Sequence, residues 1–393
     1  MLVNGERALA YTVTVDDITP IEGADNIELA HVGGWVTITR KQEYKPGDMA
    51  IFCEIDSKLP EKEWSEFLRP KKFRVKTYKL NKFGVVSQGL LLPMSVLPED
   101  KEYGVHEDVT KTLGIEYYVA EDNARKAKSN PNAKYNNMAA RHKNLAKKPW
   151  FKWLMKRMWG RKLLFLFLGN SNDKPKQFPT WIKKTDEERV ENCLWMLEDK
   201  EPYVVTEKID GTSTTFFLDA TKRKHEFGVC SRNVRQMDMN QENYVSSVGD
   251  CPNVYWEMAF KYDVNDALEK IAEEYEVDKV VLQGETYGSD VQGNKYKLNE
   301  RRFAAFNLVF DGNRLGSIQA KEILDKYEIP FVPIIETDYA LPDREEFEEF
   351  KESADGNSVI NKKCLREGFV YRSQDGQKSF KNISRKFLLK QKD

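Results

Sequence analysis

One short stretch, T-E-K-I-D-G-T-S at residues 206–213, places a potential nucleophile beside a carboxylate and a glycine. The nucleophile is the amine of Lys208, which at its ordinary pKa is protonated and unreactive. The amine becomes neutral when it is desolvated or placed near positive charge, including a metal ion. Asp210 and Gly211 follow within three residues, so this K-x-D-G spacing suits covalent chemistry on a bound ligand. The ordinary alternative is a solvated lysine in a hairpin turn.

Two β-favouring runs flank this stretch and would hold the lysine in place. Tyr203–Thr206 precedes it and Thr214–Leu218 follows it. The pattern predicts a strand, a tight loop and a second strand. We expect Gly211 to supply an unusual backbone conformation in the loop. Lys208 would then lie at the mouth of a loop with rigid walls.

Further segments downstream carry polar or aromatic residues. Residues 230–233, 280–288 and 303–309 are predicted strands or strand ends, and segments 366–372 and 378–384 follow near the end. A glycine stands directly before Glu285 and directly after Glu367 in two of these segments, where the bare backbone can approach a ligand closely. As isolated residues, both glutamates would be ordinary carboxylates at strand ends.

The order and spacing of these segments resemble the motif series of the covalent nucleotidyltransferases: ATP-dependent DNA ligases, RNA ligases and mRNA capping enzymes. In family order, Lys208 to Ser213 resembles motif I and Ser231-Arg232-Asn233 resembles motif Ia. Gly284-Glu285 resembles motif III, and Phe303 to Leu308 resembles motif IIIa. Glu367 to Val370 resembles motif IV, and Lys381 with its neighbours resembles motif V. Six elements in the right order over about 180 residues are far more specific than any single motif.

The resemblance implies a covalent mechanism. Lys208 would attack the α-phosphorus of ATP, expel pyrophosphate and form lysyl-N-AMP. The AMP would pass to a 5′-phosphate, from which a 3′-hydroxyl displaces it. The resemblance assigns ATP binding to Glu207, Asp210, Gly211, Arg232, Glu285, Phe306, Glu367, Lys378 and Lys381, and metal contact to Glu367 and Glu285. Mg²⁺, or Mn²⁺ in its place, suits a site of one or two carboxylates plus phosphate oxygens.

Each implied role has an ordinary alternative. Glu207 would contact the adenine edge, Arg232 would hold the ribose or a phosphate, and Phe306 would stack on adenine. A surface ion pair explains an isolated Arg232 equally well, and most aromatic residues in strands, like Phe306, are simply buried.

Two departures from the family pattern matter. Many relatives have two motif V lysines one residue apart, whereas Lys378 and Lys381 are three apart, so we expect Lys381 and keep Lys378 as the alternative. The sequence ends 12 residues after Lys381, which leaves no room for the OB domain that DNA ligases and capping enzymes usually carry there. Residues 185–189 (T-D-E-E-R), predicted to cap a helix through Thr185 and Glu188, also resemble RNA ligases.

Residues 1–115 are predicted to form an OB-like barrel. Alternating or apolar runs occur at Ala8–Val15, Trp35–Thr39 and Met49–Ile55, separated by turn residues such as Gly33-Gly34 and Lys45-Pro46-Gly47-Asp48. Several short strands at this spacing favour a small barrel or sandwich, and OB-like barrels often bind single strands or nucleic-acid ends.

Two basic regions could contact nucleic acid. Residues 69–82 interleave lysines and arginines with Phe73 and Tyr78, which suits phosphate contact and base stacking, or a solvated strand edge guarded by lysines. Residues 123–163 contain 13 Lys and Arg and no Asp or Glu, with helix-like apolar spacing from about Trp150. A nucleic-acid backbone track, a membrane-surface helix and a contact between domains all remain open for this second region.

Composition limits the remaining classes. The chain has 393 residues, 40% of them hydrophobic, and a net charge of -1, so it is not a polycation. Five scattered cysteines indicate reduced thiols in a cytosolic protein, and the four histidines are not spaced as zinc ligands. No signal peptide or membrane span is evident. We expect a cytoplasmic monomer without a membrane partner.

The predicted fold class is α+β. An OB-like nucleic-acid-binding domain (1–115) and a basic, partly helical linker (116–172) precede a nucleotidyltransferase domain of antiparallel sheets flanked by helices (173–393). The expected function is ATP-dependent sealing of 3′-OH/5′-phosphate nicks in duplexes with an RNA 3′-OH end, in RNA repair. The alternatives are an ATP-dependent DNA ligase, a capping-type guanylyltransferase and a catalytically inactive RNA-binding relative.

Overall fold

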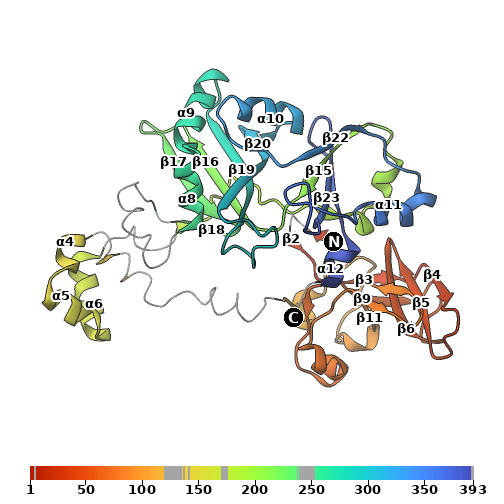
Figure 1. Cartoon of the computed structure of the whole chain (residues 1–393). Helices are drawn as coiled ribbons and strands as arrows, with labels where there is room; N and C mark the ends of the chain where they lie inside the picture. Colours follow the sequence, from red (N-terminus) through yellow and green to blue (C-terminus); the bar gives the residue numbers. More distant parts are fainter. Residues whose placement is uncertain are drawn as a thin grey trace.

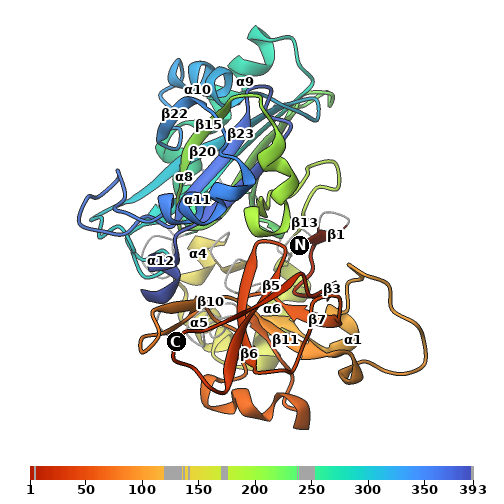
Figure 2. The ribbon, with the colours of Figure 1, turned by 90° about the vertical axis from the view of Figure 1, so that its right-hand side faces the viewer.

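The computed structural model describes residues 1–3, 6–118, 135, 138–139, 142–169, 176–236, 238 and 253–390. An N-terminal β domain lies below a larger domain of two sheets in Figures 1 and 2, and three short helices lie apart from both in Figure 1. Among the described residues, no helix is long and apolar enough to cross a bilayer.

The N-terminal domain is built from short antiparallel strands. β11-β7-β3 and β4-β5-β6 form three-stranded sheets, and β1-β2, β10-β9 and β12-β8 form two-stranded ones. Its strands are β1 (Leu2–Val3), β2 (Glu6–Arg7), β3 (Ala10–Thr14), β4 (Asp17–Pro20), β5 (Ile27–Val32), β6 (Trp35–Arg40), β7 (Met49–Cys53), β8 (Ser57–Lys58), β9 (Tyr78–Leu80), β10 (Val85–Ser87), β11 (Leu90–Pro93) and β12 (Glu116–Tyr117). Its helices are η1 (Glu63–Lys71), η2 (Met94–Val96) and α1 (Thr110–Leu113).

Alternation of buried and exposed residues explains this barrel. β5 and β6 bury every second side chain, as period-2 patterning requires. Trp35 on β6 packs against Phe52 on β7, with ring centroids 5.3 Å apart, and so joins the two three-stranded sheets. The strands predicted around residues 8–15, 35–39 and 49–55 are therefore present.

The larger domain consists of two facing sheets. The first is seven-stranded, in the order β13 (Lys176–Gln177), β18 (Val234–Arg235), β17 (Glu226–Ser231), β16 (Thr212–Asp219), β19 (Lys279–Gly288), β20 (Arg301–Phe310) and β21 (Asn313–Arg314). The second is five-stranded, in the order β14 (Glu188–Arg189), β24 (Ser379–Ile383), β23 (Gly368–Ser373), β15 (Tyr203–Lys208) and β22 (Ile334–Tyr339). All strand pairs are antiparallel except β14 with β24.

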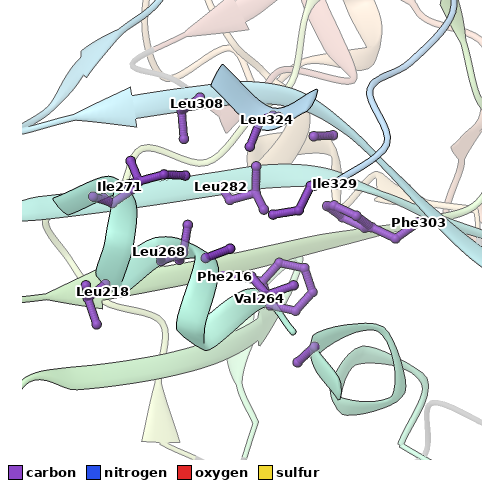
Figure 3. Packing of buried hydrophobic residues seen from close by; sticks show 14 of the residues in the cluster. Phe216, Leu218, Val264, Leu268, Ile271, Leu282, Phe303, Leu308, Leu324 and Ile329 are labelled. Carbon is purple, nitrogen blue, oxygen red and sulfur yellow. The ribbon is translucent and has the colours of Figure 1, made fainter. Parts of the chain in front are cut away.

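Helices flank these sheets. They are η4 (Val190–Asn192), η5 (Leu194–Glu198), α8 (Val254–Lys261), α9 (Val264–Glu274), α10 (Ser317–Asp325), η6 (Arg344–Glu346), α11 (Phe347–Ser353) and α12 (Arg385–Lys390). The apolar stripe of α9 is buried on the seven-stranded sheet, and Figure 3 shows Leu268 and Ile271 facing Leu282 and Leu308. Burial of one such side chain contributes about 1.5–3 kcal/mol, so this face of the sheet is firmly supported.

The two domains are in direct contact. Gly34 donates its N–H to the carbonyl of Glu191 at 2.9 Å, and the indole of Trp35 donates to Asn192 Oδ1 at 2.6 Å. A Cβ at position 34 would lie 2.6 Å from Glu191 Cα and 2.7 Å from the ring of Phe347. Glycine is therefore required here for close approach between the domains, in addition to its expected place in a turn.

Three helices, α4 (Lys143–Ala146), α5 (Pro149–Met155) and α6 (Met158–Leu168), form a separate unit. Met138, Phe151 and Leu164 are the buried residues of its own small core. The helical pattern predicted from about Trp150 is thus present, divided into two helices by the turn at residues 156–157. Much of the preceding basic stretch lies outside the described residues.

One predicted helix start is wrong. Residues 185–189 were expected to cap a helix, but Glu188–Arg189 form β14, followed by one turn of η4. Asp186 and Glu187 bind Lys381 and Arg372, and these ion pairs with the C-terminal strands favour an extended chain over a helical turn.

Candidate active site

A cavity of about 220 Å³ lies between the two sheets of the larger domain. Both sheets contribute to its wall, through β15, β23 and β24 on one side and β16, β19 and β20 on the other. The predicted site residues that line it are Glu207, Lys208, Gly211, Arg232, Glu285, Phe306 and Lys381. Asp210, Glu367 and Lys378 do not line it.

Lys208 is the last residue of β15 and directs its amine to a carboxylate. The register of β15 and β23 pairs Lys208 with Gly368, which brings the preceding residue, Glu367, alongside. The amine donates to Glu367 Oε1 at 2.7 Å, and 27% of the lysine side chain is exposed. Burial alone would lower the pKa of Lys208, but Glu367 and Glu285 outweigh it and raise that pKa. Lys208 is thus protonated when no ligand occupies the cavity.

Three carboxyl groups surround Lys208. Burial, with Glu367 and Asp210 nearby, raises the pKa of Glu285 to about 8, against the opposing effect of Lys208. Burial and Glu367 raise the pKa of Asp210 to about 7. Its backbone N–H donates to the Tyr296 hydroxyl at 2.8 Å, which fixes the loop after Lys208. Glu285 and Asp210 therefore change charge near neutral pH, and a cation bound beside them would favour their ionised forms.

Gly211 is required for a reason other than the predicted one. Its φ is not in the left-handed region. A Cβ at this position would lie 2.3 Å from the carbonyl oxygen of Thr286 and 2.9 Å from Glu285 Cγ. The glycine therefore allows the loop to pack directly on β19, which sets the separation between Lys208 and Glu285.

A second lysine forms the cationic end of the cavity. Lys381 on β24 donates to Asp186 Oδ1 at 2.8 Å, and Arg232 donates to Asp186 Oδ2 at 3.0 Å. Burial lowers the pKa of Lys381 to about 8, despite the opposing effect of Asp186. Burial would raise the pKa of Asp186, but Lys381 and Arg232 outweigh it and hold that pKa well below its usual range. The two cations are suited to binding phosphate oxygens.

An acceptor and an aromatic ring occupy another part of the wall. Glu207 is 1% exposed, and its Oε2 accepts from the N–H of Val359 at 2.8 Å. Its other oxygen, Oε1, has no hydrogen-bond partner among the described residues. Burial raises the pKa of Glu207. A buried acceptor without a partner, on a cavity wall, is suited to a ligand that donates a hydrogen bond.

A β-bulge directs Phe306 into the cavity. The β19–β20 register passes from Gln283↔Asn307 to Gly284↔Ala305, so Phe306 is the additional residue on β20. On either side of the bulge, Phe303, Ala305 and Leu308 belong to the core beneath α9. The bulge reverses the alternation of the strand and turns Phe306 toward the cavity. Its ring is half-buried among apolar neighbours and also lines the cavity, so the position is compatible with both of the expected roles.

Known protein families match the N-terminal domain and the larger domain separately. An OB-fold domain profile matches residues 9–94, and the RNA ligase profile matches residues 201–390, which contain most of the cavity wall. Residues 201–390 belong to the RNA ligase family. The predicted α+β fold class, with an OB-like barrel ahead of the catalytic domain, is confirmed.

Solved structures of one RNA ligase are similar to this RNA ligase over its whole length. The Naegleria gruberi RNA ligase with pyrophosphate is 29% identical, with a TM-score of 0.74, covering 98% of this chain and 99% of that one. A variant with ATP and Mn is 29% identical, with a TM-score of 0.73 and coverage of 98% and 100%. A variant with AMP and Mn is 28% identical, with a TM-score of 0.72 and coverage of 98% and 99%. No curated protein sequence matches the chain.

The structure separates the two candidate lysines of motif V. Lys381 lines the cavity of this RNA ligase and is 6% exposed. Lys378 lies in the preceding turn, is half exposed, and pairs with Asp199 at 2.5 Å. The expected alternative, that Lys378 contacts the nucleotide, therefore has no geometric support.

Three charged residues of the cavity wall were not assigned to the site from the sequence. They are Asp186, Glu187 and Arg372. Arg372 is 2% exposed, donates to Glu187 Oε1 at 2.8 Å, and has Nε and Nη1 without partners among the described residues. Its guanidinium carbon lies 5.8 Å from the ring centre of Phe306. The sequence did contain a signal for Arg372. Val370 and Arg372 are two positions apart and therefore lie on the same face of β23, and both line the cavity.

Within the described ranges, no group of three or more His, Cys, Asp or Glu side chains has the arrangement of a metal site. A cation at the predicted pair Glu285 and Glu367 would thus need oxygen ligands from a substrate. Glu367 fits such a role, because its Oε2 is buried and has no hydrogen-bond partner among the described residues. Oxygen donors of this kind suit Mg²⁺ and Mn²⁺.

Proposed function

We propose that this RNA ligase uses ATP to seal 3′-OH/5′-phosphate nicks through a lysyl-AMP intermediate, in RNA repair. The observation on which the proposal rests is the position of Lys208, which lines the cavity together with the cations Lys381 and Arg232 and whose amine is hydrogen-bonded to Glu367. An amine on the wall of a cavity that also carries two cations is the arrangement that phosphoryl transfer to lysine requires.

In the first step the Lys208 nitrogen attacks the α-phosphorus of ATP. An N–P bond forms, the bond from the α-phosphorus to the bridging oxygen breaks, and pyrophosphate leaves. The amine must first lose a proton to solvent, and its ion pair with Glu367 opposes this loss in the ligand-free protein. Lys381 and Arg232 neutralise the charge that develops on the leaving phosphates.

Adenine is the base that the wall favours. Glu207 Oε1 is a buried acceptor, and the exocyclic amine of adenine is a donor, whereas guanine carries a carbonyl acceptor at that position. Phe306 supplies a ring for stacking, and the guanidinium of Arg372 lies over that ring. GTP, the substrate of a capping-type enzyme, would leave the Glu207 oxygen unsatisfied.

Glu367, with Glu285 beside it, would hold Mg²⁺ or Mn²⁺ through its carboxylate oxygens. When bound, the ion supplies positive charge that favours neutral Lys208 and offsets the phosphate charge. The similar Naegleria ligase variants carry ATP or AMP together with Mn, which supports this assignment.

In the later steps AMP passes from Lys208 to a 5′-phosphate oxygen, and a 3′-hydroxyl then attacks that phosphorus and releases AMP. The domain of residues 1–115 would hold the nicked duplex, with the linker at 116–172 and the catalytic domain at 173–393. We propose that the protein acts as a cytoplasmic monomer, in keeping with its reduced cysteines.

The test is labelling with α-labelled ATP and a divalent ion. The wild type and Lys378→Ala should gain label on Lys208 that pyrophosphate discharges, while Lys208→Ala should gain none. Lys378 is a matched control because it is a half-exposed lysine of the same domain that directly precedes β24 and does not line the cavity. Label on Lys208→Ala would refute the mechanism, and label only with GTP would indicate a guanylyltransferase. Sealing of nicks with RNA but not DNA at the 3′-OH side would establish the strand preference.

A further inference from the structure

The helical hairpin (α5 and α6, residues 149–168) exposes apolar side chains that a helix in water normally buries. On α6, Met158, Trp159, Leu163, Leu166 and Phe167 are each between 43% and 77% exposed. At 100° per residue they cover one half of the helix, while Gly160 and Leu164 on the other half face the hairpin core. Lys162 is the one charged residue within this outward half of α6. The outward half of α6 is therefore almost entirely apolar.

The same helical hairpin carries a cluster of cations. Residues 142–169 contain eight Lys and Arg and no Asp or Glu. Lys147, Lys148, Lys152, Lys156 and Arg157 are all exposed, along the start of α5 and the turn between the helices. Arg157 lies over the ring of Trp153, 3.8 Å from its centre, and Trp153 is itself half exposed. An apolar face beside a cluster of cations requires a partner that is both apolar and negatively charged.

We propose that the helical hairpin binds the surface of an anionic lipid bilayer. The apolar half of α6 lies at the boundary between headgroups and acyl chains, and the cations of α5 contact lipid phosphates. The tryptophans occupy the interfacial layer that amphipathic rings prefer. An 11-residue helix is about 16 Å long, so the hairpin lies on the membrane and does not cross it.

This inference departs from the expectation of no membrane partner, and it is independent of the ligase mechanism. RNA fits the cations, and its bases can stack on exposed rings, but it does not cover the aliphatic side chains of Leu163 and Leu166, which are 43% and 77% exposed. A second copy of the chain could cover these residues only by bringing two clusters of cations together. A bilayer with anionic lipids satisfies both the charge and the apolar face.

The experiment uses the full-length protein and phosphatidylcholine vesicles with and without phosphatidylglycerol. Flotation and the blue shift of tryptophan emission report binding. The wild type should bind the anionic vesicles about tenfold or more tightly than the neutral ones. Leu166→Ser with Phe167→Ser should weaken vesicle binding by about tenfold or more, since each side chain loses a large apolar burial. Lys152→Gln with Lys156→Gln should weaken binding to the anionic vesicles alone.

Trp195→Ser is the matched control, because Trp195 is 61% exposed but lies on η5 of the catalytic domain. It should bind vesicles as the wild type does, and every variant should keep full adenylylation. Failure of the wild type to float, or unchanged flotation of the Leu166 and Phe167 variant, overturns the proposal. If both hairpin variants lose affinity for a nicked duplex equally, in an assay without vesicles, the hairpin binds RNA instead. If the wild type does not bind vesicles but forms a dimer, and the variant Leu166→Ser with Phe167→Ser is a monomer, the apolar face mediates self-association instead.

Discussion

The amine of Lys208 donates a 2.7 Å hydrogen bond to Glu367 Oε1, across the pairing of β15 with β23. The two residues are 159 positions apart in the chain. This ion pair stabilises the protonated, unreactive lysine before substrates bind. It therefore makes the reactivity of Lys208 depend on what else binds Glu367.

Replacing this carboxylate should change the acidity of the lysine directly. In Glu367→Gln, the largest opposing charge is removed while burial remains, so the pKa of Lys208 should fall. Lysine ¹⁵N NMR titration of the ligand-free protein measures that pKa without reference to catalysis. Glu348→Gln, which removes an exposed glutamate from α11, serves as the control. An unchanged Lys208 pKa in Glu367→Gln would show that the pair has little influence.

The protonated carboxyls predict how stability depends on pH. The pKa of Glu285 is raised from 4.5 to about 8, so the folded state binds more protons than the unfolded state between these values. The contribution of protonated Glu285 to folding stability is complete below the pKa of 4.5 that the residue has in the unfolded chain. It is lost as the pH rises through about 8. Glu285→Gln should thus gain stability relative to the wild type, by roughly 1–3 kcal/mol, between about pH 5 and pH 9. Denaturant unfolding of the ligand-free proteins at several pH values tests this, and parallel profiles would contradict it.

Glu207 should contribute to nucleotide affinity. Glu207→Ala removes the buried acceptor Oε1, and a hydrogen bond to a charged group contributes about 1.5–3 kcal/mol. ATP should therefore bind roughly 10- to 150-fold more weakly, while discrimination against GTP decreases. Calorimetric titration with each nucleotide on the Lys208→Ala background avoids turnover. Equal losses for ATP and GTP would place the base elsewhere in the cavity.

Gly34 should couple the two domains. In Gly34→Val, the new side chain would meet Glu191 Cα and the Phe347 ring, so the barrel must shift away. Nick sealing should fall at least about tenfold with adenylylation nearly unchanged, since the cavity lies within one domain. Gly104→Val is the control, because a Cβ there has no neighbour within 4 Å. If sealing persists in Gly34→Val, the contact between domains does not position the nick.

Lys351 and Glu191 form an ion pair with both side chains 0% exposed. Lys351→Met would leave the Glu191 carboxylate buried without its partner, which costs about 3–5 kcal/mol of folding free energy. Lys351→Met with Glu191→Leu should recover most of this loss. Denaturant midpoints of the two variants give the comparison. A single variant as stable as the wild type would mean that Glu191 takes up a proton or water at little cost.

The sequence by itself determined the order of the chemistry-bearing residues and the elements around them. K-x-D-G between two β-favouring runs located Lys208, and glycines beside Glu285 and Glu367 marked strand ends with a bare backbone. Alternation identified strands in the barrel, and helical spacing identified α5 and α6. These features depend on neighbours within a few positions of the chain, where period and turn chemistry are decisive.

The tertiary structure alone decided which of these residues meet. Lys381 and not Lys378 lines the cavity, and Asp186 is extended and not helical, because an ion pair joins Asp186 to Lys381 across 195 positions. Phe306 faces the cavity because a bulge on β20 reverses the alternation of that strand. Gly211 is required because β19 packs against its loop. Strand register and close packing depend on contacts between distant segments, and no local pattern in the sequence specifies them.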